Sequence, residues 1–232
     1  MLQFTRHWAG RQDRIAAEIT TLIVAGWTGR DSHAIEHHIE ELAALGVPRP
    51  STTPLFYRLG VGQLIQTGNL QVLGPDSSGE VEPVIVSLAD GLWVTLGSDH
   101  TDRKAEAAGV ALSKQMCGKV VGEELWRFDE VAPHWDKLML RSHATIDGQR
   151  LLYQEGSIAA IRDPRDLMAR YLGPGSSLDT ASLPPGSLMF CGTLGAIGGV
   201  RPAARFEMEL HDPVLGRSLK AGYTVEVLPV IA

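Results

Sequence analysis

One segment constrains the fold more than any other: two apolar runs, residues 81–88 (VEPVIVSL) and 92–97 (LWVTLG), flank a short turn. The intervening Ala89-Asp90-Gly91 is typical of the tight turn of a β-hairpin. Val84-Ile85-Val86 has no polar break, and such a continuous apolar run indicates a strand that enters a core. We therefore predict a hairpin that lies inside a β-rich protein.

The remaining patterns predict an α+β, β-rich fold with a few short helices. The 25 glycines and 13 prolines indicate many turns. Helices are predicted at 32–45, 102–117 and 163–172, and in the second of these Leu112 and Met116 lie on one side with two alanines. Further strands are predicted at 20–24, within 55–72, on both sides of Asp147-Gly148, and at 187–191, 204–210 and 223–228.

Length and charge limit the classes of function. The 232 residues suit a single domain, with residues 1–15 as a candidate N-terminal extension. The formal net charge is −6 and no long basic run occurs, so nucleic acid and anionic membranes gain no electrostatic attraction. We therefore expect neither of these partners.

Two features favour a cytoplasmic location. Cys117 and Cys191 are the two cysteines; they are far apart and form no CxxC pattern, which fits a reducing compartment. The N-terminus lacks the apolar core of a signal peptide, and no apolar stretch reaches the length of a membrane span.

Two polar clusters flank the open end of the predicted hairpin. Glu80 and Glu82 are two residues apart, so on a strand both point to the same side, and the hairpin returns Asp99 to this end. Convergent carboxylates suit Mg²⁺, Mn²⁺ or Ca²⁺ rather than zinc or copper, and without a cation each raises the pKa of the others. A second interpretation stays open, in which the two glutamates form the exposed face of an edge strand and Asp99 caps a helix.

A second candidate site lies in the first turn of the predicted helix 32–45. His33 and Glu36 are three residues apart and share a helical face. A carboxylate beside an imidazole raises the imidazole pKa and orients the ring, so the pair can accept a proton from water. The alternative is that both belong to the exposed side of an amphipathic helix.

A glycine-dense segment, residues 191–199, follows a predicted strand. Its backbone amides, Gly192 and Thr193 among them, are candidates to approach an anionic ligand. The segment lacks the Gly-Lys-Ser/Thr of a P-loop, and Pro202 breaks the helix that a dinucleotide site requires. A turn without a ligand is the alternative.

Other chemistry is less well supported. No GxSxG occurs, and neither cysteine has a nearby histidine, so nucleophilic catalysis has little support. Four basic residues are candidates to hold a substrate carboxylate. They are Arg58, Lys114, Lys119 and Arg127.

The order of these pieces resembles the fumarylacetoacetate hydrolase superfamily. Its members read Gly-x-Asn-Tyr-x-x-His-x-x-Glu, then Phe-x-Lys, Glu-x-Glu, Asn-Asp-x-Thr-x-Arg, Phe-Asp-x-x-x-Pro and Gly-Thr-Pro-x-Gly-x-Gly. The resemblance spans residues 20–228, and it is greatest to an uncharacterised bacterial branch whose members carry SGEVEP and SDHTDR. The corresponding segments here are 26–36, 56–58, 80–82, 98–103, 128–133 and 192–198.

The resemblance implies a mixed β-sandwich or roll, a homodimer, and a divalent metal, Mg²⁺ first, at the mouth of the fold. It implies that Glu80, Glu82 and Asp99 are the metal ligands. It also implies that His33 and Glu36 form a dyad that activates water from a lid-like helix.

The resemblance is weaker around the substrate. Arg58 stands where the family has a lysine, and Thr193 with its glycine loop would complete the substrate pocket. Thr28-Gly29 replaces the usual Asn-Tyr, the spacing from the second glutamate to the aspartate is shorter than usual, and the lysine before Phe-Asp is replaced by Arg127 or its neighbour unless Lys119 serves. The metal ligands are thus intact, whereas the substrate pocket is altered.

From these residues we predict a divalent-metal-dependent hydrolase that cleaves a C–C bond in a β-keto or 2-oxo acid, such as an acylpyruvate, through an enolate. Decarboxylation or tautomerisation of a 2-oxo acid at the same site is the first alternative. A non-catalytic carboxylate-binding protein that kept the fold is the second, because the altered pocket positions favour it. Phosphoryl transfer lacks a phosphate-binding motif.

Overall fold

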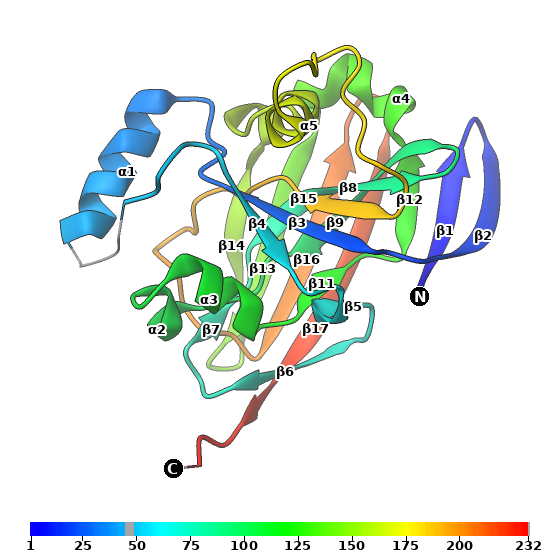
Figure 1. The fold of residues 1–232 in the computed structure, drawn as a ribbon. Helices are drawn as coiled ribbons and strands as arrows, with labels where there is room; N and C mark the ends of the chain where they lie inside the picture. Colours follow the sequence, from blue (N-terminus) through cyan, green and yellow to red (C-terminus); the bar gives the residue numbers. More distant parts are fainter. Residues whose placement is uncertain (45–48, 232) are drawn as a thin grey trace.

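The computed structural model describes residues 1–44 and 49–231, which form three sheets and a few short helices (Figure 1). The large sheet contains β1 (Leu2–Trp8), β2 (Arg11–Ala17), β3 (Thr21–Gly26), β4 (Leu55–Leu59), β5 (Leu64–Ile65), β8 (Val81–Leu88), β9 (Gly91–Ser98), β11 (Lys119–Val121), β12 (Glu124–Arg127) and β15 (Ser187–Phe190). Its order is β2-β1-β12-β9-β8-β15-β3-β4, and β11 pairs with both β9 and β5. The predicted hairpin is β8–β9, at the centre of this sheet.

A second sheet contains β14 (Gln149–Ser157), β13 (Met139–Ile146), β16 (Arg205–Asp212), β17 (Arg217–Leu228) and β6 (Asn69–Leu73), in that order. Its pairs are antiparallel apart from β17 with β6, which is parallel. A short antiparallel pair joins β7 (Ser77–Ser78) to β10 (Thr101–Asp102).

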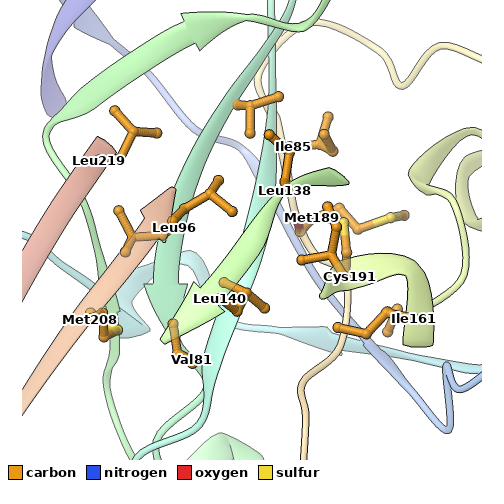
Figure 2. Close-up of a cluster of buried hydrophobic side chains, with 14 of the residues drawn as sticks. Val81, Ile85, Leu96, Leu138, Leu140, Ile161, Met189, Cys191, Met208 and Leu219 are labelled. Atoms are coloured by element: carbon orange, nitrogen blue, oxygen red, sulfur yellow. Dashed lines mark hydrogen bonds between the residues drawn. The ribbon is translucent and has the colours of Figure 1, made fainter. Parts of the chain in front are cut away.

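The main core lies between the two larger sheets (Figure 2). Ile85 of β8, Leu96 of β9 and Met189 of β15 come from the large sheet, and Leu140 of β13 and Met208 of β16 come from the second. All five side chains are buried. Their burial supplies the hydrophobic stabilisation of the sandwich, because apolar area is removed from water on both facing surfaces.

The other face of the large sheet is buried as well. Val84 and Val86 of β8 belong to one cluster with Phe4 of β1 and Leu59 of β4. Because β1 and β4 lie toward opposite ends of the strand order, this cluster forms an apolar layer that runs along the face from one side of the sheet to the other. The continuous apolar run of 81–88 therefore belongs to a strand with two buried faces. The predicted α+β, β-rich fold with a few short helices is confirmed.

Short helices connect the strands. One prediction about them is wrong: the helix expected over 102–117 is two helices, separated at residues 107–109, and Leu112 and Met116 are 55% and 42% exposed. The second helix instead buries Ser113 and Lys114. The α-helices are α1 (Ser32–Ala44), α2 (Arg103–Glu106), α3 (Val110–Met116), α4 (Phe128–Val131) and α5 (Pro164–Leu172), and the 3-10 helices are η1 (Val61–Gln63), η2 (Ala132–Lys137) and η3 (Ile158–Ala160).

The N-terminal residues join the large sheet. Residues 1–15, expected as a candidate extension, include β1 and most of β2, which form a hairpin around Ala9 and Gly10 with φ of 47° and 72°. β1 also pairs in parallel with β12, which anchors the hairpin. Among the helices of the described residues, none combines the length and the hydropathy that a membrane crossing requires.

Candidate metal centre

The open end of the β8–β9 hairpin brings three carboxylates together. Glu80 immediately precedes β8, Glu82 lies on it, and Asp99 immediately follows β9. The register pairs Val81 with Ser98, and the Asp99 amide donates to the Glu80 carbonyl at 3.0 Å. One carboxylate oxygen of each acidic residue lies within 4.8 Å of the other two. We call these three residues the carboxylate cluster.

Burial excludes the alternative in which these residues form an exposed edge. β8 lies between β9 and β15, and Glu82 and Asp99 are 2% and 0% exposed. The Glu80 side chain keeps 17% of its surface exposed. The helix cap is a different residue, since Asp102 accepts from the Ala105 amide at 2.8 Å. The cluster therefore has one carboxylate near solvent and two inside the protein.

Two buried lysines face the cluster. The Lys119 ammonium, on β11, lies 2.9 Å from Asp99 Oδ1 as an ion pair and donates to the His100 carbonyl at 2.5 Å. Its direction toward Oδ1 does not meet hydrogen-bond geometry, so that oxygen has a charge partner but no aligned donor. Lys114, on α3, donates to Asp99 Oδ2 and lies 3.6 Å from Glu80 Oε2.

Arg103 fixes the outer carboxylate. Its Nη2 donates to Glu80 Oε1 at 2.9 Å, and its Nη1 donates to Glu106 at 3.1 Å. Its Nε donates to Ser78 Oγ at 2.7 Å. Because a guanidinium has its donors in a rigid plane, these three contacts hold both Arg103 and Glu80 in one orientation.

Burial and charge act differently on the two buried carboxyls. Burial alone would raise the pKa of Asp99, but Lys114 and Lys119 outweigh burial and hold this pKa well below its ordinary value. Burial raises the pKa of Glu82 well above its ordinary value, and the nearby Asp99 charge raises it further. Glu82 is therefore the cluster member whose ionised form would gain most from a bound cation.

The glycine-dense segment supplies a donor to Glu82. The Gly192 amide donates to Glu82 Oε2 at 2.7 Å. Gly192 has φ of 103°, and a Cβ at this position would collide with the side-chain oxygen of Thr28. Only glycine suits both the backbone conformation and this close approach.

Thr193 anchors the same segment. Its Oγ1 donates to the Val81 carbonyl at 2.7 Å and accepts from Gln154 Nε2 at 2.8 Å. Gln154, on β14, also accepts from the Val81 amide at 3.0 Å. These contacts tie the segment to the start of β8, so Gly192 and Thr193 lie beside the cluster. Their expected role in binding the substrate stays a prediction.

A chain of buried polar groups lies behind Asp99. His100 Nδ1 lies 2.8 Å from the Tyr223 hydroxyl, and His100 Nε2 lies 2.9 Å from Ser77 Oγ. The Tyr223 hydroxyl in turn lies 2.8 Å from Ser98 Oγ. Burial, with the positive charges nearby, lowers the pKa of His100 to about 3, so this imidazole is neutral at physiological pH.

The predicted dyad is not assembled in this conformation. His33 and Glu36 lie on α1 and are exposed; Figure 1 shows this helix standing beside the sheets. The His33 amide donates to Asp31 at 2.9 Å, and the Glu36 carboxylate pairs with Arg49. Within the described part of the chain, no hydrogen bond or ion pair joins the dyad to the carboxylate cluster. Its catalytic role stays a prediction.

Two of the predicted basic residues have other partners. Arg58 is exposed on β4, and its Nη1 donates to the Tyr171 hydroxyl at 2.9 Å. Arg127 pairs in register with Trp93, near the opposite end of β9 from Asp99, and its guanidinium lies 5.3 Å from the Trp93 ring centre. The structure does not bring Arg127 to the cluster, because the register of β12 sets it at the far end.

Three residues around the cluster were given no role from the sequence. Arg103 and His100 stand in the same short segment as Asp99, so their position was the available signal. Tyr223 is 123 residues away from His100 and reaches it because the second sheet packs there. No local pattern reveals that contact.

The donor set fits a divalent ion. All three side chains offer carboxylate oxygens, which Mg²⁺ and Ca²⁺ prefer. Among the described residues, one hydrogen bond reaches the buried Glu82 carboxylate, from the neutral Gly192 amide, so its charge is incompletely compensated. Glu80, Glu82 and Asp99 are the residues that would hold the ion.

A separate hollow of about 640 Å³ lies at the tip of the β1–β2 hairpin. It shares no residue with the carboxylate cluster. It is lined by His7, Trp8, Ala9, Gly10, Arg11, Gln12, Glu130, Leu215 and Arg217.

The fold and the site together describe a β-rich α+β protein with a candidate metal site of three carboxylates at the open end of its central hairpin. The family model described as "Protein of unknown function (DUF2848)" matches residues 25–223, and the chain belongs to this family. No curated protein matches the chain.

Solved structures share the fold. A 2-keto-3-deoxyarabinonate dehydratase superposes with a TM-score of 0.62 at 16% identity, covering 91% of this chain and 75% of that one. The same kind of enzyme in complex with magnesium and 2,5-dioxopentanoate gives 0.59 at 16% identity, covering 92% and 75%. The protein Cg1458 gives 0.61 at 15% identity, covering 91% and 77%. At these identities the similarity establishes the fold alone.

Proposed function

We propose that this protein belongs to the fumarylacetoacetate hydrolase superfamily and is a magnesium-dependent enzyme that acts on a 2-oxo acid. The carboxylate cluster carries the proposal, because three converging carboxylates with two of them buried form an oxygen site for a hard cation. The similarity to a dehydratase that binds magnesium and 2,5-dioxopentanoate supports the same ligand chemistry.

The chain's own residues would position the ion and the substrate. When bound, the ion would act as a Lewis acid toward the 2-oxo group and stabilise negative charge that develops there. Lys119 keeps Asp99 ionised, and the Gly192 amide orients Glu82. We propose that the Gly192–Thr193 segment, which contacts Glu82 of the cluster, forms one side of the substrate pocket.

C–C hydrolysis is the reaction that we propose first. The oxygen of water joins the acyl carbon, the bond to the neighbouring carbon breaks, and its electron pair goes to the 2-oxo acid fragment. That fragment takes up a proton, so the products are a carboxylic acid and a shorter 2-oxo acid. His33 would accept the proton from water, with Glu36 orienting the imidazole.

The position of α1 supports this role for His33. The helix begins four residues after Thr28, and Thr28 packs against Gly192, the neighbour of the carboxylate cluster. An approach of α1 toward the cluster would be needed for catalysis. His33→Gln is expected to lower turnover at least tenfold with little change in metal affinity, whereas His37→Gln on the same helix should leave turnover unchanged. Equal turnover of the two variants would remove His33 from the mechanism.

Dehydration is a second candidate reaction, since two of the similar structures described above are dehydratases. It shares the activated 2-oxo acid but expels hydroxide from the substrate and needs no attacking water. Decarboxylation and tautomerisation start from the same activated acid. Product analysis separates them, because hydrolysis alone yields two organic acids from one without loss of carbon dioxide.

The test begins with binding. Mg²⁺ and Mn²⁺ are titrated calorimetrically into metal-stripped protein with and without oxalate, which mimics the enolate of a 2-oxo acid. Binding that oxalate strengthens supports the site, and substrates are then screened by NMR, with 2,4-dioxo acids and 2-keto-3-deoxy sugar acids first. No metal binding at millimolar concentration would refute the enzyme proposal. Binding of metal and oxo acid without any product would instead assign a carboxylate-binding protein.

The superfamily resemblance also leads us to propose a homodimer in the cytoplasm. Size-exclusion chromatography with light scattering measures the oligomeric state, and the mass of a single chain at micromolar concentration would refute the homodimer. Cell fractionation measures the location, and recovery outside the cytoplasmic fraction would refute the cytoplasmic assignment.

A further inference from the structure

Lys114 differs from Lys119 and Arg103, the other cations around the carboxylate cluster, in its polar contacts. Its ammonium donates to Asp99 and lies 3.6 Å from Glu80, and its side chain is 8% exposed. Both of these partners are proposed metal ligands. Lysine is rarely buried to this extent, because moving an ammonium from water into the interior is unfavourable unless charged partners surround it.

The other two cations have partners outside the cluster. Lys119 also donates to the His100 carbonyl. Arg103 also donates to Ser78 and Glu106. Among the polar contacts of the described residues, those of Lys114 go to Glu80 and Asp99 alone. Of the three cations, Lys114 is the one that can leave without breaking another polar contact.

The helix that carries Lys114 is oriented to place it there. α3 turns Leu112 and Met116 outward, 55% and 42% exposed, and buries Ser113 and Lys114. An amphipathic helix of this sequence would gain more hydrophobic stabilisation in the opposite orientation. The electrostatic attraction between the ammonium and the cluster is the compensating interaction.

Charge counting gives Lys114 a specific role. Glu80, Glu82 and Asp99 carry three negative charges when ionised, and Glu106, the second carboxylate partner of Arg103, adds a fourth. Arg103, Lys114 and Lys119 supply three positive charges. A divalent ion that binds while all three cations stay would turn this excess of one negative charge into an excess of one positive charge in a largely buried site, which is unfavourable.

We propose that the Lys114 ammonium is the resident counter-cation of the carboxylate cluster, and that it competes with a divalent ion for Glu80 and Asp99. The inference rests on the metal site of the proposed function and deepens it. Metal binding then requires the ammonium to withdraw from the two carboxylates, which lowers metal affinity. Without the ion, the same ammonium offsets part of the negative charge of Glu80 and Asp99.

The experiment measures metal affinity directly. Mn²⁺ alone is titrated calorimetrically into the metal-stripped wild type, Lys114→Met and Lys104→Met. Methionine keeps the length of the side chain and removes its charge. Lys104 is exposed on α2, so the same substitution there controls for a change in net charge. We expect Lys114→Met to bind Mn²⁺ at least tenfold more tightly than the wild type, and Lys104→Met to bind within threefold of it.

A second variant keeps the test usable if Lys114→Met does not fold. Lys114→Gln keeps a hydrogen-bond donor for Asp99 and removes the charge, and it too should bind Mn²⁺ more tightly. Thermal unfolding with and without saturating Mn²⁺ gives an independent reading. Both variants should unfold at lower temperature than the wild type without metal, and metal should raise their midpoints more than it raises that of the wild type.

The possible results separate the two proposals. Binding to Lys114→Met but not to the wild type would support competition, as would the tenfold gain. Equal or weaker binding by both Lys114 variants, with normal binding by the wild type, would overturn the role of Lys114 and leave the metal site standing. No Mn²⁺ binding by any of the proteins would overturn the metal site and this inference with it.

Discussion

Asp99 illustrates how single residues set the stability of the cluster. Its carboxylate is fully buried and faces the ammonium groups of both Lys114 and Lys119. Burial of one ion is unfavourable, but the group of three is stabilised by mutual attraction in a medium of low polarity. Loss of one member therefore harms the protein more than the loss of a surface ion pair would.

Asp99→Asn is expected to lower the free energy of unfolding by about 3–5 kcal/mol, because it leaves two buried lysines without their shared carboxylate. Asp136→Asn is the control, since Asp136 is 54% exposed and pairs with Arg30 at the surface, where about 1 kcal/mol or less is expected. Urea denaturation measures both. Similar losses for the two variants would show that the Asp99 contacts contribute little.

The two cysteines give a second prediction at this scale. Both are buried and free, and burial raises the pKa of Cys117 and, more strongly, that of Cys191. Because the thiolate is the reactive form, neither should react with a disulfide reagent at neutral pH while the protein is folded. Two thiols should react after denaturation, as the composition requires. Rapid labelling of the native protein would contradict the burial of the two thiols.

At the scale of elements, one loop connects the cluster with α1. The segment after β15 donates its Gly192 amide to Glu82, and Thr28, shortly before α1, packs against the same glycine. Thr193 joins this segment to β8 and β14 through Val81 and Gln154. A change in the conformation of this segment should therefore shift both Glu82, a proposed metal ligand, and the residues that lead into α1.

Gly192→Ala should destabilise the protein by about 2–4 kcal/mol, because alanine is strained at positive φ and its Cβ collides with Thr28. It should also weaken Mg²⁺ binding, since the displaced backbone no longer orients Glu82. Gly195→Ala is the control, as a Cβ there meets nothing within 4 Å and the φ is not positive. Calorimetric titration and thermal unfolding measure both effects, and a Gly192→Ala variant with wild-type affinity would contradict the second.

At the scale of the whole molecule, the cluster links folding to pH and to metal. The pKa of Glu82 is higher in the folded protein than its ordinary value of 4.5, so the folded state binds this proton more tightly than the unfolded chain. The contribution of Glu82 to stability is thus present below pH 4.5 and is lost as pH rises through the raised pKa. The contribution of Asp99 to stability depends on pH in the opposite direction. Its pKa is lowered in the folded protein, so this contribution is present above pH 3.8 and is lost as pH falls through the lowered pKa.

We therefore expect Glu82→Gln to stabilise the metal-free protein at neutral pH and to remove its response to Mg²⁺. Glutamine keeps an acceptor for the Gly192 amide but carries no buried charge. Each kcal/mol gained raises the melting temperature by about 2–4 °C in a chain of this size. Thermal scans from pH 4 to pH 8, with and without Mg²⁺, measure both effects. A variant that is less stable than the metal-free wild type at pH 7, or that still responds to Mg²⁺, would refute this account of Glu82.

Much of the fold was predictable from local pattern. Glycine- and proline-bounded apolar runs identify most strands, and Asp90-Gly91 identifies the hairpin that carries the cluster. The convergence of Glu80, Glu82 and Asp99 follows from that hairpin, because its register is a local property. The break between α2 and α3 was missed, since the apolar spacing over 102–117 satisfies one helix as well as two.

The sequence by itself determined the elements that short-range geometry controls: the strands, the turn and the three carboxylates at the end of one hairpin. Only the tertiary structure decided which cations face them. Lys114 and Lys119 compensate Asp99, and Tyr223 reaches His100, because separate elements pack at one place. Such contacts depend on the packing of two sheets and a short helix over the hairpin, and electrostatic attraction there overrides the apolar pattern of α3. That is why Lys114 lies in the interior while Leu112 lies outside.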